Sequence, residues 1–360
     1  MRDILPQLAG WWRESRPFAL ATLVDAVGST PLPVGTAMAV DGEGAVLGAI
    51  SGGCVDADVA ATAQDVLRDG RPVLRRYGPA GPGSGPFDVG LTCGGTITVW
   101  IEPVPPDGAW WLPVLAAAVG AGRPVAHAVR LSSASPGHLV VLPDGGREGS
   151  VGAGEVDRDA EAASRRLLPE GGTAVLGSGP HPDVFVAAHA SPPLLAIVTW
   201  TPVARPLARI GVELGYRPVV LEHRPVFAAQ ARDAGVEVLP GLPQTGLRTL
   251  RAEGALNGRS AVVVLTHDAR VDVPALLEAA EGGVGYLGAI GSAATIRDRS
   301  GRLRDAGLDE AGRSAIHSPI GLLLGGRAPA EVATAIAAQL VAVRVSPRHP
   351  GPRRAVGSGC

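Results

Sequence analysis

The first residue in this sequence whose type and setting favour chemistry is Cys54, which follows the small residues Ser51-Gly52-Gly53. An apolar, strand-like stretch precedes this turn and a helical pattern follows it, so we place the thiol where a strand leads into a helix. Free N–H groups and the positive dipole end at a helix start lower the pKa of a thiol, and glycines let a ligand approach the backbone. Asp56, in the first helical turn, suits the dipole but opposes a thiolate charge. The turn therefore predicts a reactive or ligand-binding thiol.

A second cysteine, Cys93, precedes Gly94-Gly95 in the same way but leads into a strand, so a helix dipole is not indicated there. Two soft thiols on glycine turns are able to hold a soft transition metal or to relay sulfur. The alternative is that both are small buried hydrophobic residues, as free cysteines often are. They form no CxxC pair and no Cys/His cluster has zinc spacing, which disfavours structural zinc. The third cysteine, Cys360, is expected to be a bare tail thiol.

Polar residues in the second half of the chain follow apolar, strand-like runs, and ligands of parallel sheets bind beyond the carboxyl ends of strands. His267-Asp268 follows the run 261–265, where the alternative is a helix cap and a packing histidine. Gly288-Ala289-Ile290-Gly291-Ser292 ends the run 284–287 and opens a helix, whose N–H groups would suit a phosphate. Arg327, before the last helix, is a candidate to pair with an anion, although a surface arginine is the commoner outcome.

Two stretches compete as a nucleotide-binding loop. Gly177-Ser178-Gly179-Pro180-His181-Pro182 begins like a dinucleotide fingerprint, but its prolines favour a hairpin turn. The first strand-to-helix turn of the second half is instead 199–204, which contains no glycine, and Trp200 would crowd a pyrophosphate. Glu222 lies about twenty residues further on, where dinucleotide-binding proteins carry an acidic residue that binds the ribose. Alone, it is weak support for a nucleotide site. NAD(P) binding is therefore disfavoured.

The pattern of helices and strands that must position these residues differs between the two halves of the chain. In the first half we expect helices at 3–15, 54–68 and 155–168, with a further helix after residue 109, and strands at 18–27, 37–40, 45–50, 73–77, 96–102, 124–131 and 137–142. Gly70 closes the second helix, a Gly/Pro-rich loop occupies 78–85, and a hairpin completes this half. We find no convincing internal repeat.

Ser191-Pro192-Pro193 marks a boundary, after which strands and helices alternate. Strands are expected at 195–199, 218–221, 236–239, 261–265 and 284–287, and helices at 203–214, 226–234, 272–280, 292–306 and 329–344. This alternation implies a parallel sheet covered on both faces. The prediction is an α/β protein with a mixed α+β domain at 1–190 that carries the cysteine turns, a Rossmann-like domain at 191–345, and a disordered Pro/Gly/Arg-rich tail at 346–360.

Composition sets limits on function. A chain of 360 residues with 46% hydrophobic residues is long enough for two buried cores, and a net charge of −2 gives no basic field for nucleic acid or a membrane surface. All basic residues are arginine, which excludes a P-loop lysine or a lysine Schiff base. The sparse cysteines, and the lack of a signal peptide or a long apolar segment, predict a soluble cytoplasmic protein.

These landmarks together resemble the xanthine dehydrogenase accessory factor family, XdhC/CoxI. The matching motifs of the first half are Gly28-Ser29-Thr30-Pro31 with Gly35 and Met38, Gly48-Ala49-Ile50-Ser51-Gly52-Gly53-Cys54-Val55, Leu91-Thr92-Cys93-Gly94-Gly95 and Ile101-Glu102-Pro103. Those of the second half are Glu222-His223-Arg224, Leu265-Thr266-His267-Asp268, Tyr286-Leu287-Gly288-Ala289-Ile290-Gly291-Ser292 and His317-Ser318-Pro319-Ile320-Gly321-Leu322. Their order and spacing cover nearly the whole chain.

The resemblance implies a chaperone more than a turnover enzyme: a protein that binds molybdenum cofactor and assists its sulfuration and insertion into a molybdenum hydroxylase such as xanthine dehydrogenase or carbon monoxide dehydrogenase. The partners implied are a cysteine desulfurase and a molybdenum hydroxylase subunit, while base rates favour a homodimer. Cys54 and Cys93 would contact molybdenum or sulfur. The cofactor-binding set would comprise Ser51, Gly52, Gly53, Cys54, Cys93, Gly94, Gly95, His267, Asp268, Gly288, Gly291, Ser292 and Arg327.

This chain also departs from the family pattern. Thr199-Trp200-Thr201-Pro202 replaces a glycine-rich turn, and Leu323 stands where an acidic residue is usual. Asp56 replaces Glu, Glu222 replaces Asp and Gln339 replaces Glu. Two further functions remain open: an NAD(P)-dependent oxidoreductase that uses the second half, and a scaffold that docks a dehydrogenase and binds no cofactor.

Overall fold

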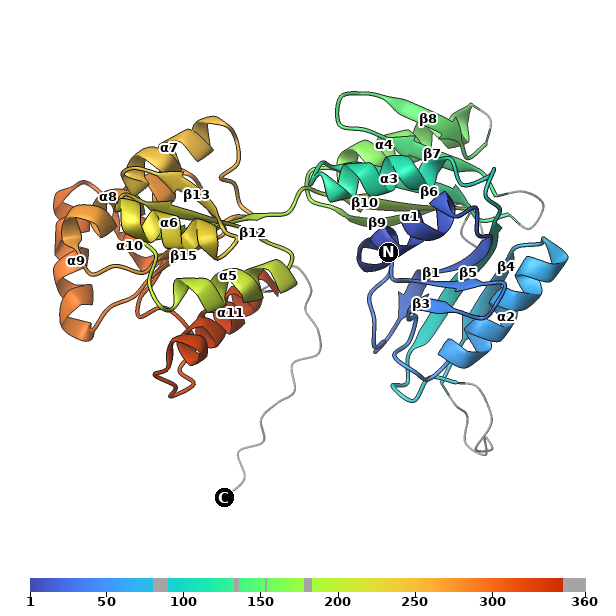
Figure 1. Ribbon diagram of the computed structural model, residues 1–360, viewed down its shortest axis with the longest axis horizontal. Helices are drawn as coiled ribbons and strands as arrows, with labels where there is room; N and C mark the ends of the chain where they lie inside the picture. Colours follow the sequence, from blue (N-terminus) through green and yellow to red (C-terminus); the bar gives the residue numbers. More distant parts are fainter. Residues whose placement is uncertain (80–89, 133–135, 153, 178–182, 346–360) are drawn as a thin grey trace, which may run out of the picture. The chain divides into compact units, whose positions relative to one another are not determined.

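The computed structural model describes residues 1–79, 90–132, 136–152, 154–177 and 183–345 (Figure 1). The chain divides into two compact units, Met1–Ser191 and Pro192 to the C-terminus. Most of the expected Gly/Pro-rich loop, the Ser178–Pro182 part of the hairpin turn and the expected tail 346–360 with Cys360 lie outside the described residues.

The first unit begins with a module of two helices and a five-stranded antiparallel sheet. Its elements are η1 (Arg2–Ile4), α1 (Leu5–Arg13), β1 (Phe18–Val27), β2 (Ala37–Asp41), β3 (Val46–Gly48), α2 (Asp56–Asp69), β4 (Val73–Tyr77) and β5 (Thr96–Val104), with strand order β3-β2-β1-β5-β4. The apolar stripe of α2, Val59, Ala63 and Val66, packs on one face of this sheet. Gly70 ends α2 in a left-handed conformation with φ +67°, as predicted.

A second module repeats this architecture. Its elements are α3 (Trp111–Gly120), β6 (Val125–Arg130), β7 (His138–Val141), β8 (Arg147–Ser150), α4 (Glu155–Leu167), β9 (Gly172–Leu176) and β10 (Val184–His189), with strand order β8-β7-β6-β10-β9. Each strand takes the place of its counterpart in the order β3-β2-β1-β5-β4, and each module has one helix before its first strand and one between its third and fourth.

The strand register shows that the two modules correspond residue by residue. Met38 pairs with Gly48 and Leu139 pairs with Gly149, so both partners recur 101 residues later (38 to 139, 48 to 149). The left-handed glycines of the first module recur at the same interval, since Gly44, Gly48 and Gly70 correspond to Gly145, Gly149 and Gly171. The first unit therefore contains an internal repeat, and the expectation that the chain has none is wrong. Few side chains coincide, because what the modules share is mainly backbone conformation at turns.

Apolar residues of both modules form a common core between the sheets, and a polar group lies buried within it. Glu102 Oε2 lies 3.6 Å from His138 Nε2, and His138 Nδ1 lies 3.1 Å from His127 Nε2. The Trp111 ring stacks on both imidazoles, with centroids 4.4 Å and 5.3 Å away. Burial raises the pKa of Glu102 to about 8, partly opposed by the Trp100 indole, and lowers the pKa of His138 to about 4.

The second unit is a six-stranded parallel sheet with strand order β13-β12-β11-β14-β15-β16, which confirms the Rossmann-like prediction. Its strands are β11 (Leu194–Val198), β12 (Arg217–Glu222), β13 (Glu237–Pro240), β14 (Ala261–Val264), β15 (Tyr286–Ala289) and β16 (Ile316–His317). Its helices are α5 (Ala204–Glu213), α6 (Pro225–Asp233), α7 (Pro243–Ala252), α8 (Ala269–Glu281), α9 (Ala293–Asp305), α10 (Glu310–Ser314) and α11 (Pro329–Val345).

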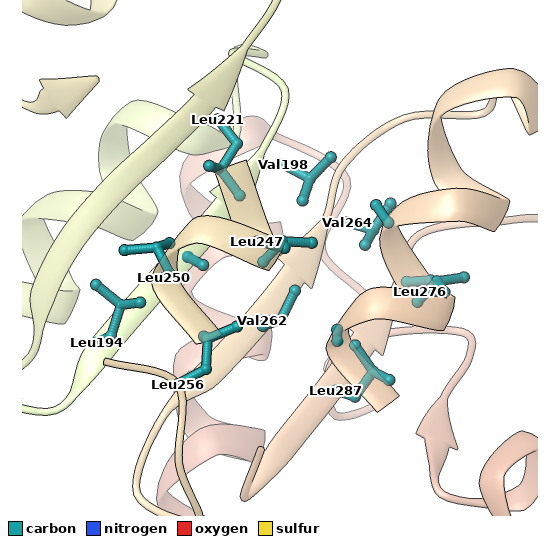
Figure 2. Close-up of a cluster of buried hydrophobic side chains, with 14 of the residues drawn as sticks. Leu194, Val198, Leu221, Leu247, Leu250, Leu256, Val262, Val264, Leu276 and Leu287 are labelled. Carbon is teal, nitrogen blue, oxygen red and sulfur yellow. The ribbon is translucent and has the colours of Figure 1, made fainter. Parts of the chain in front are cut away.

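Separate apolar cores cover the two faces of this sheet. On one face, Leu247 and Leu250 of α7 and Leu276 of α8 pack on strand residues such as Val262 (Figure 2). On the other face, α5 and α11 cover the sheet through residues such as Leu207 and Ile336. Burial on both faces explains why the strands read as continuous apolar runs.

Candidate functional site

The turn that carries Cys54 is held in place by the carboxylate of Asp56. This carboxylate accepts hydrogen bonds from the N–H groups of Ile50 (2.7 Å), Ser51 (3.0 Å) and Gly53, and from the Ser51 hydroxyl at 3.1 Å. Partial burial of Asp56 raises its pKa, but these hydrogen bonds outweigh that effect and leave the pKa below its ordinary value. Helix α2 begins at Asp56 and not at Cys54, so the thiol lies just before the helix.

The structure brings the two cysteine turns together. Cys54 Sγ lies 3.4 Å from the hydroxyl oxygen of Thr92, the residue directly before Cys93. The Thr92 hydroxyl and backbone lower the pKa of Cys54, while the charge of Asp56 acts in the opposite direction. Activation therefore comes mainly from a contact between distant segments, which the helix-dipole argument did not foresee. Both thiols are exposed, so the alternative of buried hydrophobic cysteines is wrong.

A third glycine turn packs against the second. A Cβ at Gly95 would lie 2.1 Å from the carbonyl oxygen of Ser29, and a Cβ at Gly28 would lie 3.4 Å from the Gly95 Cα. Only a residue without a side chain permits this approach at position 95. We call Cys54, Thr92 and Cys93, with the turns 28–30, 51–53 and 94–95, the thiol site.

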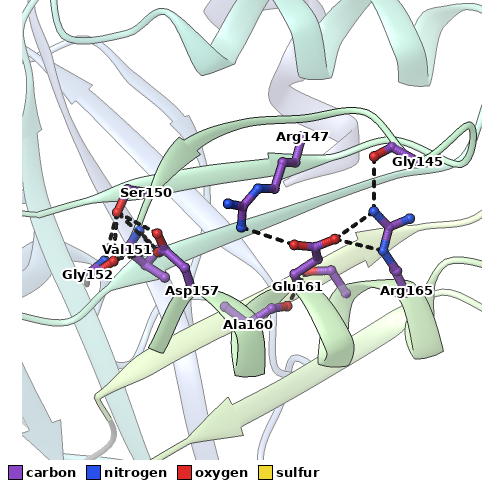
Figure 3. A network of polar contacts seen from close by, with 10 residues as sticks. Gly145, Arg147, Ser150, Val151, Gly152, Asp157, Ala160, Glu161 and Arg165 are labelled. Atoms are coloured by element: carbon purple, nitrogen blue, oxygen red, sulfur yellow. Dashed lines mark hydrogen bonds and ion pairs between the residues drawn. The ribbon is translucent and has the colours of Figure 1, made fainter. Parts of the chain in front are cut away.

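The second module contains the same anchored turn without a thiol (Figure 3). Asp157 accepts hydrogen bonds from the N–H groups of Val151 (2.8 Å) and Gly152 (3.1 Å) and from the Ser150 hydroxyl (2.8 Å). Position 155, which is 101 residues after Cys54, is glutamate. The aspartate-anchored turn is therefore a property of the repeated fold, and the cysteine distinguishes the first module.

Among the residues that the structure describes, no group of three or more His, Cys, Asp or Glu side chains has the arrangement of a metal site. Within that part of the chain, the thiol site offers the two thiols as soft ligands. Such an open set suits a ligand that arrives with most of its own coordination.

In the second unit, Asp268 serves as the N-cap of α8. Its carboxylate accepts the Arg270 N–H at 3.0 Å and pairs with the Arg270 guanidinium at 2.7 Å, and this pairing lowers the pKa of Asp268 to about 2. This matches the alternative of a helix cap. His267 is exposed, so it is not the packing histidine of that alternative.

The second predicted glycine loop starts later than expected. Strand β15 runs to Ala289, so Gly288 lies within the buried strand, where a Cβ would meet the Ile320 side chain at 2.6 Å. Ser292 caps α9 by accepting the Thr295 N–H at 3.3 Å, and Gly291 lies between strand and cap. Arg327 is exposed before α11, where its N–H donates to Glu331 at 2.9 Å.

Arg299, a residue that the sequence-based prediction did not include, joins the carboxyl ends of three strands. Its side chain is only 4% exposed, and its guanidinium pairs with the buried Asp272 at 2.8 Å. It also donates to the carbonyls of Ile290 at 2.8 Å and Thr266 at 3.5 Å, and it lies 3.4 Å from the Ser318 hydroxyl, so it contacts the segments that follow β15, β14 and β16. Helix α9 carries several arginines, so no local pattern shows which of them is buried.

In the first strand-to-helix turn of this unit, groups of the protein itself take up the hydrogen bonds that a nucleotide would need. Thr199 adopts a left-handed conformation with φ +80°, which usually calls for glycine. One oxygen of Glu222 accepts the Trp200 N–H at 2.8 Å, and the other accepts the Arg224 N–H at 2.9 Å. The carboxylate at the ribose position is thus engaged within the protein.

Comparison with known proteins finds models of the same family in both units. The profile of the XdhC and CoxI family matches residues 11–78, and that of the XdhC Rossmann domain matches residues 195–340. The chain is 27% identical over 330 residues to the molybdenum cofactor insertion chaperone PaoD of Escherichia coli, covering 91% of this chain and 83% of that protein. It is 23% identical over 326 residues to a Bacillus subtilis protein named as a probable subunit of xanthine dehydrogenase, covering 90% and 92%.

A solved structure described as a xanthine dehydrogenase from Bacillus halodurans shares the fold, with a TM-score of 0.74, 24% identity and coverage of 98% of both chains. No helix within the described residues is long and apolar enough to cross a membrane. Both halves of the chain therefore lead to the same assignment: it belongs to the xanthine dehydrogenase accessory factor (XdhC/CoxI) family.

Proposed function

We propose that this protein is a cytoplasmic chaperone that binds molybdenum cofactor as its cargo and assists its sulfuration and insertion into a molybdenum hydroxylase. The client would be of the xanthine dehydrogenase or carbon monoxide dehydrogenase type, and a cysteine desulfurase would supply the sulfur. The observation that carries this proposal is the meeting of two exposed thiol turns through Cys54 and Thr92. The name of the Escherichia coli relative, a molybdenum cofactor insertion chaperone, supports the same cargo.

The chemistry of the thiol site fits such a cargo. The cofactor presents a dithiolene-bound molybdenum, a pterin and a phosphate, and a soft thiolate suits molybdenum or a sulfur in transit. The lowered pKa of Cys54 increases its thiolate fraction near neutral pH. Apart from the chain neighbours, no described atom lies within 4 Å of a Cβ built at Gly52, Gly53 or Gly94, so a ligand is able to approach the backbone there.

In this proposal Cys54 and Cys93 contact molybdenum or sulfur, and the backbone of their glycine turns contacts the rest of the cofactor. Of the residues predicted in the second unit, His267 and Arg327 are exposed, and each is proposed to meet an anionic group. Asp268 and Ser292 already serve as helix caps, so they would support their loops.

The experiment is to purify the full chain from cells that make molybdenum cofactor, denature it, and measure molybdenum and pterin fluorescence. We expect both in the wild type, and clearly less in Cys54→Ser and in the Cys54→Ser/Cys93→Ser double variant. Glu155→Ser, at the equivalent turn of the second module, is the matched control and should retain wild-type levels. Unchanged molybdenum in the double variant would refute the thiol role.

The two alternative functions have their own tests. An NAD(P)-dependent oxidoreductase would bind NAD(H) or NADP(H) at micromolar concentrations in calorimetry, but the engaged Glu222 carboxylate and the turn at Trp200 argue against such binding. A cofactor-free scaffold would recover a large hydroxylase polypeptide in a pull-down, with no pterin in the sample.

A further inference from the structure

The two exposed cysteines lie on turns that touch each other. Cys54 Sγ contacts the Thr92 hydroxyl at 3.4 Å, and Cys93 is the next residue in the chain. Glycines in left-handed conformations flank both thiols, at Gly52, Gly53 and Gly94. Apart from the chain neighbours, no described atom lies within 4 Å of a Cβ built at these glycines, so no other segment packs against the turns at these points. A disulfide needs Cα atoms about 4.4–6.8 Å apart, a separation within reach of two turns already in side-chain contact.

The internal repeat shows that the thiols occur as a pair. Position 155 of the second module, the equivalent of Cys54, is glutamate. The second module contains no cysteine at all, since the three cysteines of the sequence are Cys54, Cys93 and Cys360. The aspartate-anchored turn is nevertheless kept at Asp157. The fold thus does not require the cysteines, and one module has both while the other has neither, which favours a role that uses both sulfur atoms.

We propose that Cys54 and Cys93 form a reversible intramolecular disulfide, and that this modification closes the thiol site to its cargo. The oxidant is a low-molecular-weight disulfide. The Cys54 thiolate attacks one of its sulfur atoms and expels a thiolate, which leaves a mixed disulfide on Cys54. Cys93 then loses its proton, attacks Cys54 Sγ and expels the second thiolate. The two cysteines are oxidised by two electrons, and one small disulfide becomes two small thiols.

The first test needs no cofactor. The full chain carrying Cys360→Ser, which removes the tail thiol, is treated with excess low-molecular-weight disulfide and denatured, and its thiols and intact mass are measured. We expect both free thiols to be lost, the mass to fall by two hydrogen atoms, a peptide linking positions 54 and 93, and full reversal by a dithiol. Two stable mixed disulfides, a covalent dimer, or unreacted thiols would each overturn the proposal.

A matched variant tests whether the contact between the two turns, and not only the reactivity of the thiols, selects the disulfide partner. In the same Cys360→Ser chain, Cys93→Ser combined with Glu155→Cys keeps two thiols but moves the second to the equivalent turn of the other module. This variant should end as two mixed disulfides, whereas the parent ends as an internal crosslink. An internal crosslink in both would show that contact between the turns is not what selects the partner.

The closing of the site rests on the proposed function, and the outcomes distinguish the two. If the disulfide forms but molybdenum retention does not change, the role of the thiols in cargo binding fails while the modification stands. If no disulfide forms but Cys54→Ser loses molybdenum, the chaperone function stands and the redox inference fails. Loss of retention on oxidation, with recovery on reduction, would support both.

Discussion

The buried group formed by Glu102, His138 and His127 predicts an unusual dependence of stability on pH. Burial raises the pKa of Glu102 from 4.5 to about 8. At about 1.4 kcal/mol per unit, this corresponds to roughly 5 kcal/mol between the protonated and ionised states. A group whose pKa is raised on folding contributes its full stability below the unfolded value of 4.5, and that contribution is lost as the pH rises through about 8.

The histidines act at the other end of the pH range. Burial lowers the pKa of His138 and of His189 from 6.5 to about 4, and it lowers the pKa of His127 well below its ordinary value. Groups with depressed pKa values and a positive protonated form contribute stability above about pH 6.5, which is lost as the pH falls through about 4. Near pH 6 we therefore expect Glu102 protonated, the imidazoles neutral, and the first unit close to its greatest stability.

The variant Glu102→Gln replaces the titrating carboxyl group with an amide of nearly the same shape. The histidine contribution is common to both proteins, so we expect the unfolding free energy of the wild type, measured relative to that of the variant, to fall by on the order of 3–5 kcal/mol between about pH 5 and pH 9. The assay is denaturant unfolding followed by tryptophan fluorescence, which reports mainly on the first unit because Trp200 is the only tryptophan of the sequence outside it. Equal slopes against pH in the two proteins would refute the reasoning. A variant less stable than the wild type at about pH 9 would do the same.

Three further predictions concern the contacts at the two sites. Thr92→Val removes a hydroxyl that lowers the pKa of Cys54, so the pH profile of Cys54 alkylation should shift to higher pH, while Thr92→Ser should leave it in place; identical profiles in all three proteins would contradict this. Gly95→Ala forces a Cβ to within 2.1 Å of the Ser29 carbonyl oxygen, so it should lower the free energy of unfolding by about 1–3 kcal/mol in denaturant unfolding. In the control Gly42→Ala, the added Cβ has no described atom within 4 Å beyond its chain neighbours. That variant should change the free energy of unfolding by less than about 0.5 kcal/mol. Arg299→Met leaves the buried Asp272 unpaired and should cost about 3–5 kcal/mol by circular dichroism, with Arg302→Met, whose pair with Asp298 is exposed, as the control; the prediction fails if the two variants are equally stable.

The elements with strong local patterns were predictable from the sequence. Strands β1 and β4 have the expected bounds, because each combines apolar and β-branched residues and ends at a glycine. Helix α7 was missed because Gly246 interrupts it, although a Cβ there would meet Leu221 at 2.5 Å, so tertiary packing requires that glycine. Strand β8 was missed because its residues Arg147–Ser150 are all exposed and show no alternation. Neither element has a pattern that stands out before its neighbours are known.

The internal repeat was hidden for a related reason. The two modules share left-handed glycines and an anchoring aspartate, Asp56 and Asp157, rather than apolar side chains of the same type. Sparse backbone constraints at turns do not rise above chance in one sequence. Strand register, which compares positions through hydrogen bonds, shows the correspondence directly.

The sequence by itself determined that two cysteines stand on glycine turns, that the second half forms a parallel sheet, and that both halves carry motifs of one family. These are local properties, because turn residues and apolar periodicity act over a few neighbours. Only the tertiary structure decided that Cys54 touches Thr92, that Arg299 joins three strand ends, and that Glu222 is engaged by Trp200 and Arg224. Each of these contacts joins residues brought together by chain folding, and the two thiols become one site only because folding brings their turns into contact.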